Sequence, residues 1–164
     1  MHISIIKPDL SHTTAISTIC TAGWKQTVAG KLSEVYQNEN VANWYNLERV
    51  EKDILAGSYT HVAILKSKVV GVIGGGLTVP TTGEVFVLYV AEENRYMGVG
   101  RQLLDALTAQ QKEKGALEQW VSVQEDNQHG IPFYEARGFA FKNKKITTTS
   151  TGEKQVSLRY QRKI

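Results

Sequence analysis

The sequence predicts a mixed α/β (α+β) fold: a mostly antiparallel central sheet that contains one parallel pair of strands, with helices on both faces. An apolar run that begins at Glu84 and a second one over residues 119–123 are separated by apolar residues at helical spacing. Strands joined by such a crossover helix run parallel. Short polar connections flank this unit on either side, and they are typical of antiparallel hairpins.

The composition indicates one ordinary folded domain. The chain has 164 residues, of which 41% are apolar and 21% charged, which excludes disordered and fibrous classes. Because no linker or internal repeat interrupts it, we expect a single domain over residues 1–164. The one cysteine, Cys20, excludes an internal disulfide and fits a reducing compartment. No stretch approaches the roughly 18 apolar residues of a membrane span, and the start of the chain has no signal-peptide pattern. We therefore expect a cytoplasmic protein without a membrane partner.

The sequence argues against nucleic acid as a partner because of its mild charge, and against a metal ion because of its histidine spacing. The net charge is only +3, and the basic residues gather in two groups, over 142–145 and 159–163, where a solvated surface strand is the simplest interpretation. Nucleic-acid binding through this basic tail would show a steep dependence on salt. His129 has no second ligand at metal-binding spacing, so no metal is expected.

The first third of the chain predicts a strand followed by helices. Ile3 and Ile5 alternate with polar residues and predict a short strand. A helix follows, capped by Asp9 or Ser11. Its apolar side is expected to consist of Ala15, Ile16, Ile19 and Trp24, and its end is expected near Lys25. The signal over residues 30–46 is ambiguous, whereas Leu47–Leu55 reads as a second short helix.

The middle of the chain predicts an antiparallel hairpin. Residues 61–65 and 69–79 form its strands, and residues 66–68 form its tight turn. Three glycines, 74–76, interrupt the second strand, although glycine weakens a strand and packs nothing. They predict a bulge, or a close approach by another backbone or by a ligand. Residues 80–83 then turn into the strand that begins at Glu84.

The last third continues the alternation of helices and strands. The helix that begins near Val99 should end over residues 112–115, which are basic and then glycine. The remaining elements are a strand over 119–123, a helix over 128–137, and a final hairpin with strands over 139–146 and 155–160.

The turn between the predicted strand at Glu84 and the helix at Val99 is a candidate anion site. A strand, a short turn and a helix opened by glycine aim several unpaired backbone N–H groups at one spot. Gly98 and Gly100 remove side chains where a polyanion would have to come close. Arg101, in the first helical turn, runs against the usual preference for acidic residues, and a bound phosphate would explain it.

Residues 95–100 resemble the Q/R-x-x-G-x-G/A signature of the GNAT superfamily of N-acetyltransferases, in which this loop binds the pyrophosphate of acetyl-CoA. Residues 127–139 resemble the N-x(6)-[FY]-Y-x-x-x-G-F stretch of the same family. The resemblance implies the GNAT fold, in which the two parallel strands splay apart and the pantetheine arm lies between them. It implies acetyl-CoA as co-substrate and direct attack by a primary amine in a ternary complex. It also suggests a homodimer.

The resemblance implies roles for particular residues. The cofactor-binding set is Leu88, Tyr89, Val90, Arg95, Tyr96, Met97, Gly98, Val99, Gly100, Arg101, Asn127 and Tyr134. Tyr134 would be the general acid that protonates the departing CoA thiolate. Glu84 would be the general base, because its distance to the signature is like that of the glutamate base of GNAT histone acetyltransferases. Other family members take the base from elsewhere or use ordered water. Tyr96 and Met97 stand where glycine or basic residues are common, so we expect backbone contacts there.

The leading hypothesis is therefore an acetyl-CoA-dependent N-acetyltransferase that acts on a small, polyamine-like molecule or on a protein amine. The alternative is a non-catalytic acyl-CoA-binding or sensing module. A polycationic acceptor favours acidic residues around the mouth of the site. Five are available: Glu34, Glu39, Glu48, Glu51 and Asp53. The dinucleotide-binding fingerprint fails on spacing, because no third glycine and no acidic strand end follow Gly100.

Overall fold

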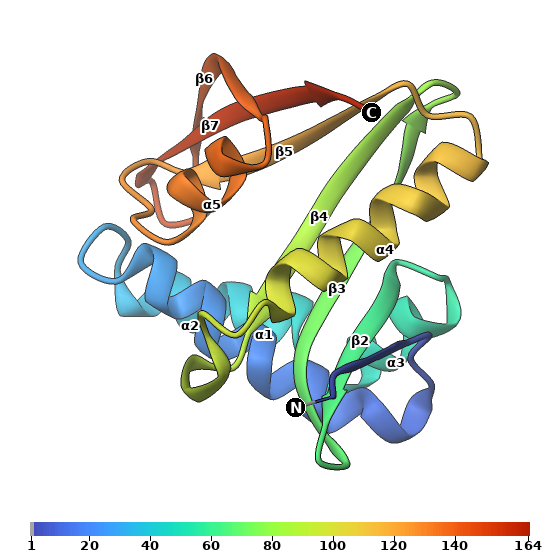
Figure 1. The fold of residues 1–164 in the computed structure, drawn as a ribbon. Helices are drawn as coiled ribbons and strands as arrows, with labels where there is room; N and C mark the ends of the chain where they lie inside the picture. Colours follow the sequence, from blue (N-terminus) through green and yellow to red (C-terminus); the bar gives the residue numbers. More distant parts are fainter. Residues whose placement is uncertain (1) are drawn as a thin grey trace.

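The computed structural model describes residues 2–164, which form a seven-stranded sheet in the order β1-β2-β3-β4-β5-β7-β6 (Figure 1). The strands are β1 Ser4–Ile6, β2 Tyr59–Leu65, β3 Lys68–Val79, β4 Thr82–Val90, β5 Glu118–Gln124, β6 Ala140–Thr148 and β7 Lys154–Lys163. The helices are α1 Thr13–Val28, α2 Glu34–Trp44, α3 Leu47–Leu55, α4 Val99–Glu113 and α5 Gly130–Ala136, with short 3-10 turns at Leu10–His12 and Glu92–Asn94. Within the described chain β4 and β5 pair in parallel and the other neighbours pair antiparallel, which confirms the predicted mixed sheet.

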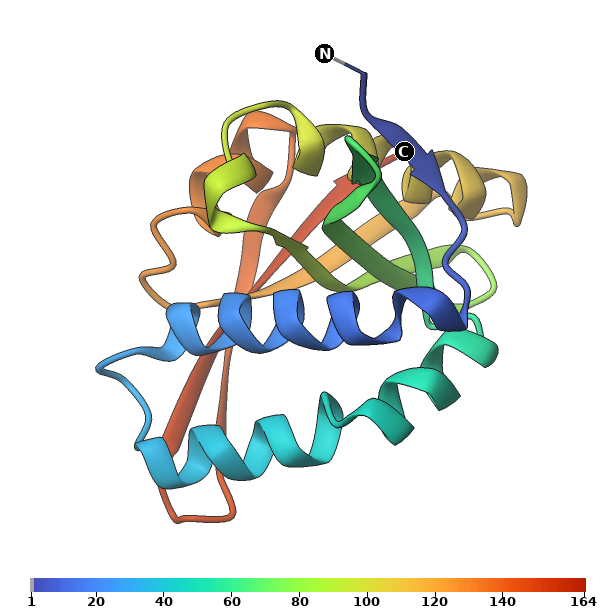
Figure 2. The ribbon, with the colours of Figure 1, turned by 90° about the horizontal axis from the view of Figure 1, so that it is seen from below.

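Helices cover both faces of the sheet and produce two apolar cores. Helices α1, α2 and α3 lie over one face (Figure 2), and the core beneath them includes Ile16, Cys20 and Val50, all without exposed surface. Helix α4 covers the opposite face, where Leu103 and Leu104 are equally buried. At one edge of the sheet, β6 is covered by neither layer, and every one of its residues is exposed.

One helix was missed by the sequence prediction. The ambiguous stretch over 30–46 contains α2, which begins after Ser33, whose hydroxyl accepts a hydrogen bond from the backbone N–H of Tyr36. None of the residues of α2 is buried. Only Tyr36 and Val41 of this helix pack against the core, and both are partly buried, so the helix lacks the regular apolar repeat on which sequence prediction depends. The predicted helix over Leu47–Leu55 is confirmed.

The glycines of β3 serve both predicted purposes. The pairing of β3 with β4 shifts between Gly74 and Gly75, which face Val87 and Val85, so the strand pair contains a bulge. A Cβ at Gly74 would lie 2.3 Å from the carbonyl oxygen of Ser58, and one at Gly75 would lie 2.3 Å from that of Glu84. Backbone atoms therefore occupy the space that side chains would need.

A buried glutamine of α4 joins the strands where the parallel pair is formed. Gln111, 1% exposed, donates from Nε2 to the carbonyl oxygens of Glu84 (3.0 Å) and Gly76 (3.3 Å). Its Oε1 accepts from Nε2 of Gln119 on β5 at 2.9 Å. A Cβ at Gly83 would lie 2.2 Å from the same Oε1, so glycine is required there. One amide thus ties α4 to β3, β4 and β5.

Replacing Gln111 with leucine should lower the free energy of unfolding by about 2–4 kcal/mol, because two buried carbonyl groups would lose this donor and the Gln119 amide would keep only its bond to Thr108. Chemical denaturation measures the change. Gln110→Leu is the matched control: the Oε1 of Gln110 is buried and has no hydrogen-bond partner in the described chain. Its replacement should change stability by less than about 0.5 kcal/mol. Equal effects of the two substitutions would contradict the role given to Gln111.

Candidate active site

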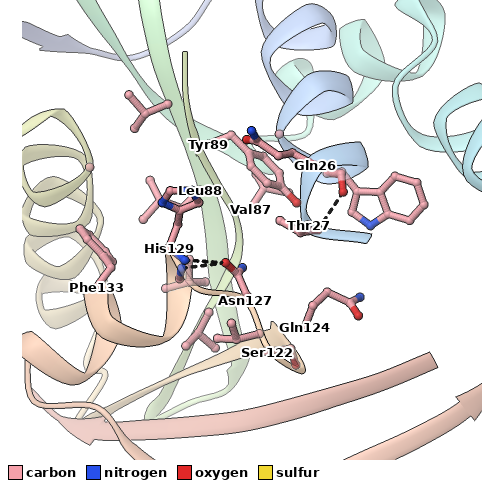
Figure 3. A pocket seen from close by; sticks show the side chains of 18 of the residues that line it. Gln26, Thr27, Val87, Leu88, Tyr89, Ser122, Gln124, Asn127, His129 and Phe133 are labelled. Carbon is pink, nitrogen blue, oxygen red and sulfur yellow. Dashed lines mark hydrogen bonds between the residues drawn. The ribbon is translucent and has the colours of Figure 1, made fainter. Parts of the chain in front are cut away.

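A cleft of about 1260 Å³ opens where β4 and β5 diverge. The parallel pairing ends at Val85 and Val121, yet the strands continue to Val90 and Gln124. Figure 3 shows Val87, Leu88 and Tyr89 of β4 facing the cleft from one side and the end of β5 from the other.

The facing edges of the two strands have backbone groups without a strand partner among the described residues. Beyond the last parallel pair, Leu88, Tyr89 and Val90 line the cleft and have no partner on β5. An unpaired strand edge is a row of N–H donors and C=O acceptors suited to an extended ligand that carries amide groups. All three residues belong to the cofactor-binding set that the family resemblance implies.

The N-terminus of α4 forms an uncapped anion site on the cleft wall. Gly98 precedes the helix with φ +83°, a left-handed conformation that favours glycine. No side chain of the described chain caps the helix, and its first turn holds no acidic residue, so the first backbone N–H groups are available to an anion. A Cβ at Gly100 would lie 3.2 Å from the ring of Phe133 in α5, so this glycine lets α5 approach. Arg101 also lines the cleft.

The side chains of Arg95 and Met97, which flank this anion site, contact other parts of the protein. Arg95 lines the cleft, but its guanidinium donates a hydrogen bond to the side chain of Gln26 in α1. Met97 does not line the cleft. It packs against the core beneath α4, and its sulfur accepts from Asn94 Nδ2 at 3.9 Å. Its side chain therefore supports the loop and does not face the cleft.

Asn127 and Gly130 shape the opposite wall. The Oδ1 of Asn127 accepts from the backbone N–H groups of His129 (3.1 Å) and Gly130 (2.8 Å), as drawn in Figure 3. A Cβ at Gly130 would lie 2.7 Å from Asn127 Nδ2, which explains the small residue at this position. The amide is thereby fixed at the cleft with its NH₂ group still able to donate.

Tyr134 lies in a dry part of the cleft. It is 7% exposed, and its ring packs edge to face with Phe133 and Phe139, at centroid distances of 5.1 and 5.2 Å. Burial raises the pKa of its hydroxyl well above the ordinary value for tyrosine. The hydroxyl is therefore protonated at neutral pH and is available as a proton donor.

Glu84 is placed differently from the other predicted residues. It is not among the residues that line the cleft, and its carboxylate accepts two hydrogen bonds from Arg159 of β7, at 2.6 and 2.9 Å. Glu84 in turn raises the pKa of Arg159. Arg159 also donates to Ser122 at 2.8 Å. Because Arg159 occupies both carboxylate oxygens and Glu84 lies outside the cleft lining, the geometry does not favour the predicted base role, which stays a prediction.

The far half of the cleft is an aromatic chamber built mainly from α1, α2 and α3. It is lined by Trp24, Asn40, Trp44, Tyr45, Arg49, Asp53, Ser58 and Tyr59. The guanidinium of Arg49 lies 4.2 Å from the centre of the Trp44 ring, and its Nε donates to Asp53 at 3.0 Å. Of the five acidic residues proposed for the mouth of the site, only Asp53 lines the cleft among the described residues. Trp44 and Tyr45 are adjacent in the sequence, but their place in this chamber depends on α2, which the sequence did not predict.

Comparison with known proteins identifies the fold and the family. The model of the GNAT acetyltransferase family matches residues 23–139. The spermidine N(1)-acetyltransferase of Thermoplasma acidophilum is 28% identical over 145 residues, covering 85% of this chain and 89% of that protein.

Solved structures share the architecture over almost the whole chain. The PaiA N-acetyltransferase of Thermoplasma acidophilum, solved in complex with coenzyme A, superposes with a TM-score of 0.82 at 24% identity and covers 100% of both chains. Ard1 of Thermoplasma volcanium gives a TM-score of 0.71 at 21% identity, covering 100% of this chain and 99% of its own. Within residues 2–164 no helix combines the length and apolar character needed to cross a membrane. By its family match, its splayed strand pair and its anion loop, the chain belongs to the GNAT family of acetyltransferases.

Proposed function

We propose that this GNAT acetyltransferase transfers the acetyl group of acetyl-CoA to a primary amine of a small, polyamine-like cation. The observation that carries the proposal is the continuity of one cleft, which joins the anion site of α4, the unpaired edges of β4 and β5, Tyr134 and the aromatic chamber. The name of the curated relative, a spermidine acetyltransferase, supports the choice of acceptor.

We call the part of the cleft beside α4 and the diverging strands the donor half. Its residues fit acetyl-CoA, which supplies an activated acetyl thioester. The uncapped N–H groups before and within the first turn of α4, with Arg101 beside them, suit a diphosphate. The strand edge at Leu88, Tyr89 and Val90 offers N–H donors for amides and for the oxygen that gains negative charge during acyl transfer. Asn127 adds a fixed NH₂ donor on the opposite wall.

Tyr134 is suited to donate a proton to the departing thiolate. Its raised pKa makes it a weak acid, but the same dry surroundings also raise the pKa of a thiol. The protein contains an internal example, since burial raises the pKa of Cys20 to about 12. A thiolate formed beside Tyr134 would therefore be a strong base, and proton transfer to it would be less costly than the ordinary pKa values suggest.

The aromatic chamber is suited to a cation. Ammonium and guanidinium groups bind favourably over the faces of tryptophan and tyrosine rings. Arg49 already occupies such a position over Trp44, next to the carboxylate of Asp53. A polyamine carries several cationic groups along an apolar chain, so one of them can bind the aromatic wall while an uncharged terminal amine reaches the acetyl group.

An assay of thiol release from acetyl-CoA tests the proposal with a panel of amines: polyamines, amino acids, aminoglycosides and peptide N-termini. We expect polyamines to give the highest kcat/KM. Release with peptides alone would move the assignment to a protein acceptor. Binding of CoA without thiol release for any amine would support the non-catalytic module instead.

Tyr134→Phe should lower kcat by about 100-fold, the usual effect of losing a general acid, while the Kd of CoA stays close to wild type. Steady-state kinetics and a CoA titration measure the two quantities. Tyr36→Phe is the control, because Tyr36 packs edge to face on Trp24 and lies outside the cleft lining. Because the pKa of Tyr134 is raised, wild-type kcat should show no loss of this donor up to about pH 10. Turnover of Tyr134→Phe at the wild-type rate across pH would exclude the acid role.

Glu84→Gln should keep kcat/KM within about threefold of wild type, whereas loss of a true general base costs about 100-fold or more. The reason is that Arg159 already holds both carboxylate oxygens. We infer that the proton of the amine leaves through water. A large fall in kcat/KM, with loss of the acidic limb of its pH profile, would establish Glu84 as the base after all.

A further inference from the structure

Tyr96, in the loop before α4, has a strained backbone. Its φ is +62°, and it is the one aromatic residue among the described non-glycine residues with positive φ. The others are Lys66, Ser67 and Asp126. A bulky side chain in this region is a true outlier, and such strain persists where the surroundings impose it. Tyr96 is 90% exposed, so burial of its ring does not offset the strain.

The side chain of Tyr96 crosses to the other wall of the cleft. Its hydroxyl lies 3.0 Å from Nδ1 of His129, and the two ring centres are 6.2 Å apart. The backbone N–H of His129 is itself held by Asn127 at 3.1 Å. The contact therefore joins the loop before α4 to the segment before α5, and we call this pair the Tyr96–His129 bridge.

The bridge lies at the entrance of the donor half. Both of its residues line the cleft together with Gly98, Gly100 and Phe133. An extended ligand anchored by phosphate at the start of α4 has to run between the two loops to reach the gap between β4 and β5. The bridge connects these loops across that route.

We propose that the Tyr96–His129 bridge retains CoA: it closes over the bound co-substrate and sets the rate at which CoA leaves. The strain at Tyr96 is then the cost of aiming an aromatic hydroxyl across the entrance, where glycine would leave it open. The proposal depends on acetyl-CoA as co-substrate and is independent of which amine is acetylated.

The first test is the dissociation rate of CoA, measured by stopped-flow displacement. Tyr96→Phe removes the hydroxyl alone and should speed dissociation about fivefold, the worth of one neutral hydrogen bond. His129→Ala should have a similar effect, and the double variant should add little to either, because both remove the same contact. Tyr36→Phe, away from the cleft, should leave the rate unchanged. Wild-type dissociation rates for Tyr96→Phe, or fully additive effects in the double variant, would overturn the proposal.

A second variant separates retention from a structural role. Tyr96→Gly relieves the positive φ and should raise the Tm of the free protein, yet it should speed CoA dissociation at least as much as Tyr96→Phe. A residue that merely stabilised the loop would lower the Tm and speed dissociation together, and that outcome would count against the bridge. Neither measurement uses an amine, so failure here is distinguishable from failure of the proposed polyamine acetylation.

Discussion

The active site depends on the point at which two parallel strands stop pairing. On the paired side of that point, Gln111 donates hydrogen bonds to carbonyl groups of β3 and β4 and accepts one from the side-chain amide of Gln119 on β5. Buried backbone groups are costly when unpaired, so a strand pair can end inside a protein only if another group forms hydrogen bonds with the strand backbone. The protein supplies that partner from α4 at the closed end. At the open end it leaves the strand edges facing the cleft, where a ligand can serve as the partner.

The two halves of the cleft are built differently. The half beside α4 presents mainly backbone: the N–H groups of α4, the edges of two strands and glycines that leave space beside them. The aromatic chamber presents side chains from several helices, and Arg49 and Asp53 offset each other's charge within it. Backbone groups have the same chemistry in every sequence, whereas the side chains of the chamber differ in size and charge.

The difference between the two halves of the cleft explains which parts of the site could be predicted from the sequence. The anion loop is a local pattern of a strand, two closely spaced glycines and a helix. Asn127 and Tyr134 likewise lie in one short stretch. The local sequence therefore indicated residues that the structure brings to one cleft. The partner of Glu84 was not predictable in this way, because Arg159 follows it by 75 residues and meets it only through the pairing of β5 with β7. The direction of the Met97 side chain, which packs against the core, was not predictable either, because local spacing does not reveal which side of a loop is covered.

The basic residues near the end of the chain form two groups that differ in their surroundings. Arg159 and Arg162 point inward, and Arg162 donates to Gln119 and to the carbonyl oxygen of Arg137. Lys142, Lys144 and Lys145 instead lie along β6, the fully exposed outer strand. The free edge of an outer strand is a template on which a second chain can add a strand and start an aggregate. Lysines along that strand oppose such addition by charge repulsion and by their cost of dehydration. Three lysines on β6 therefore make the free edge of this strand a poor partner for a strand of another copy.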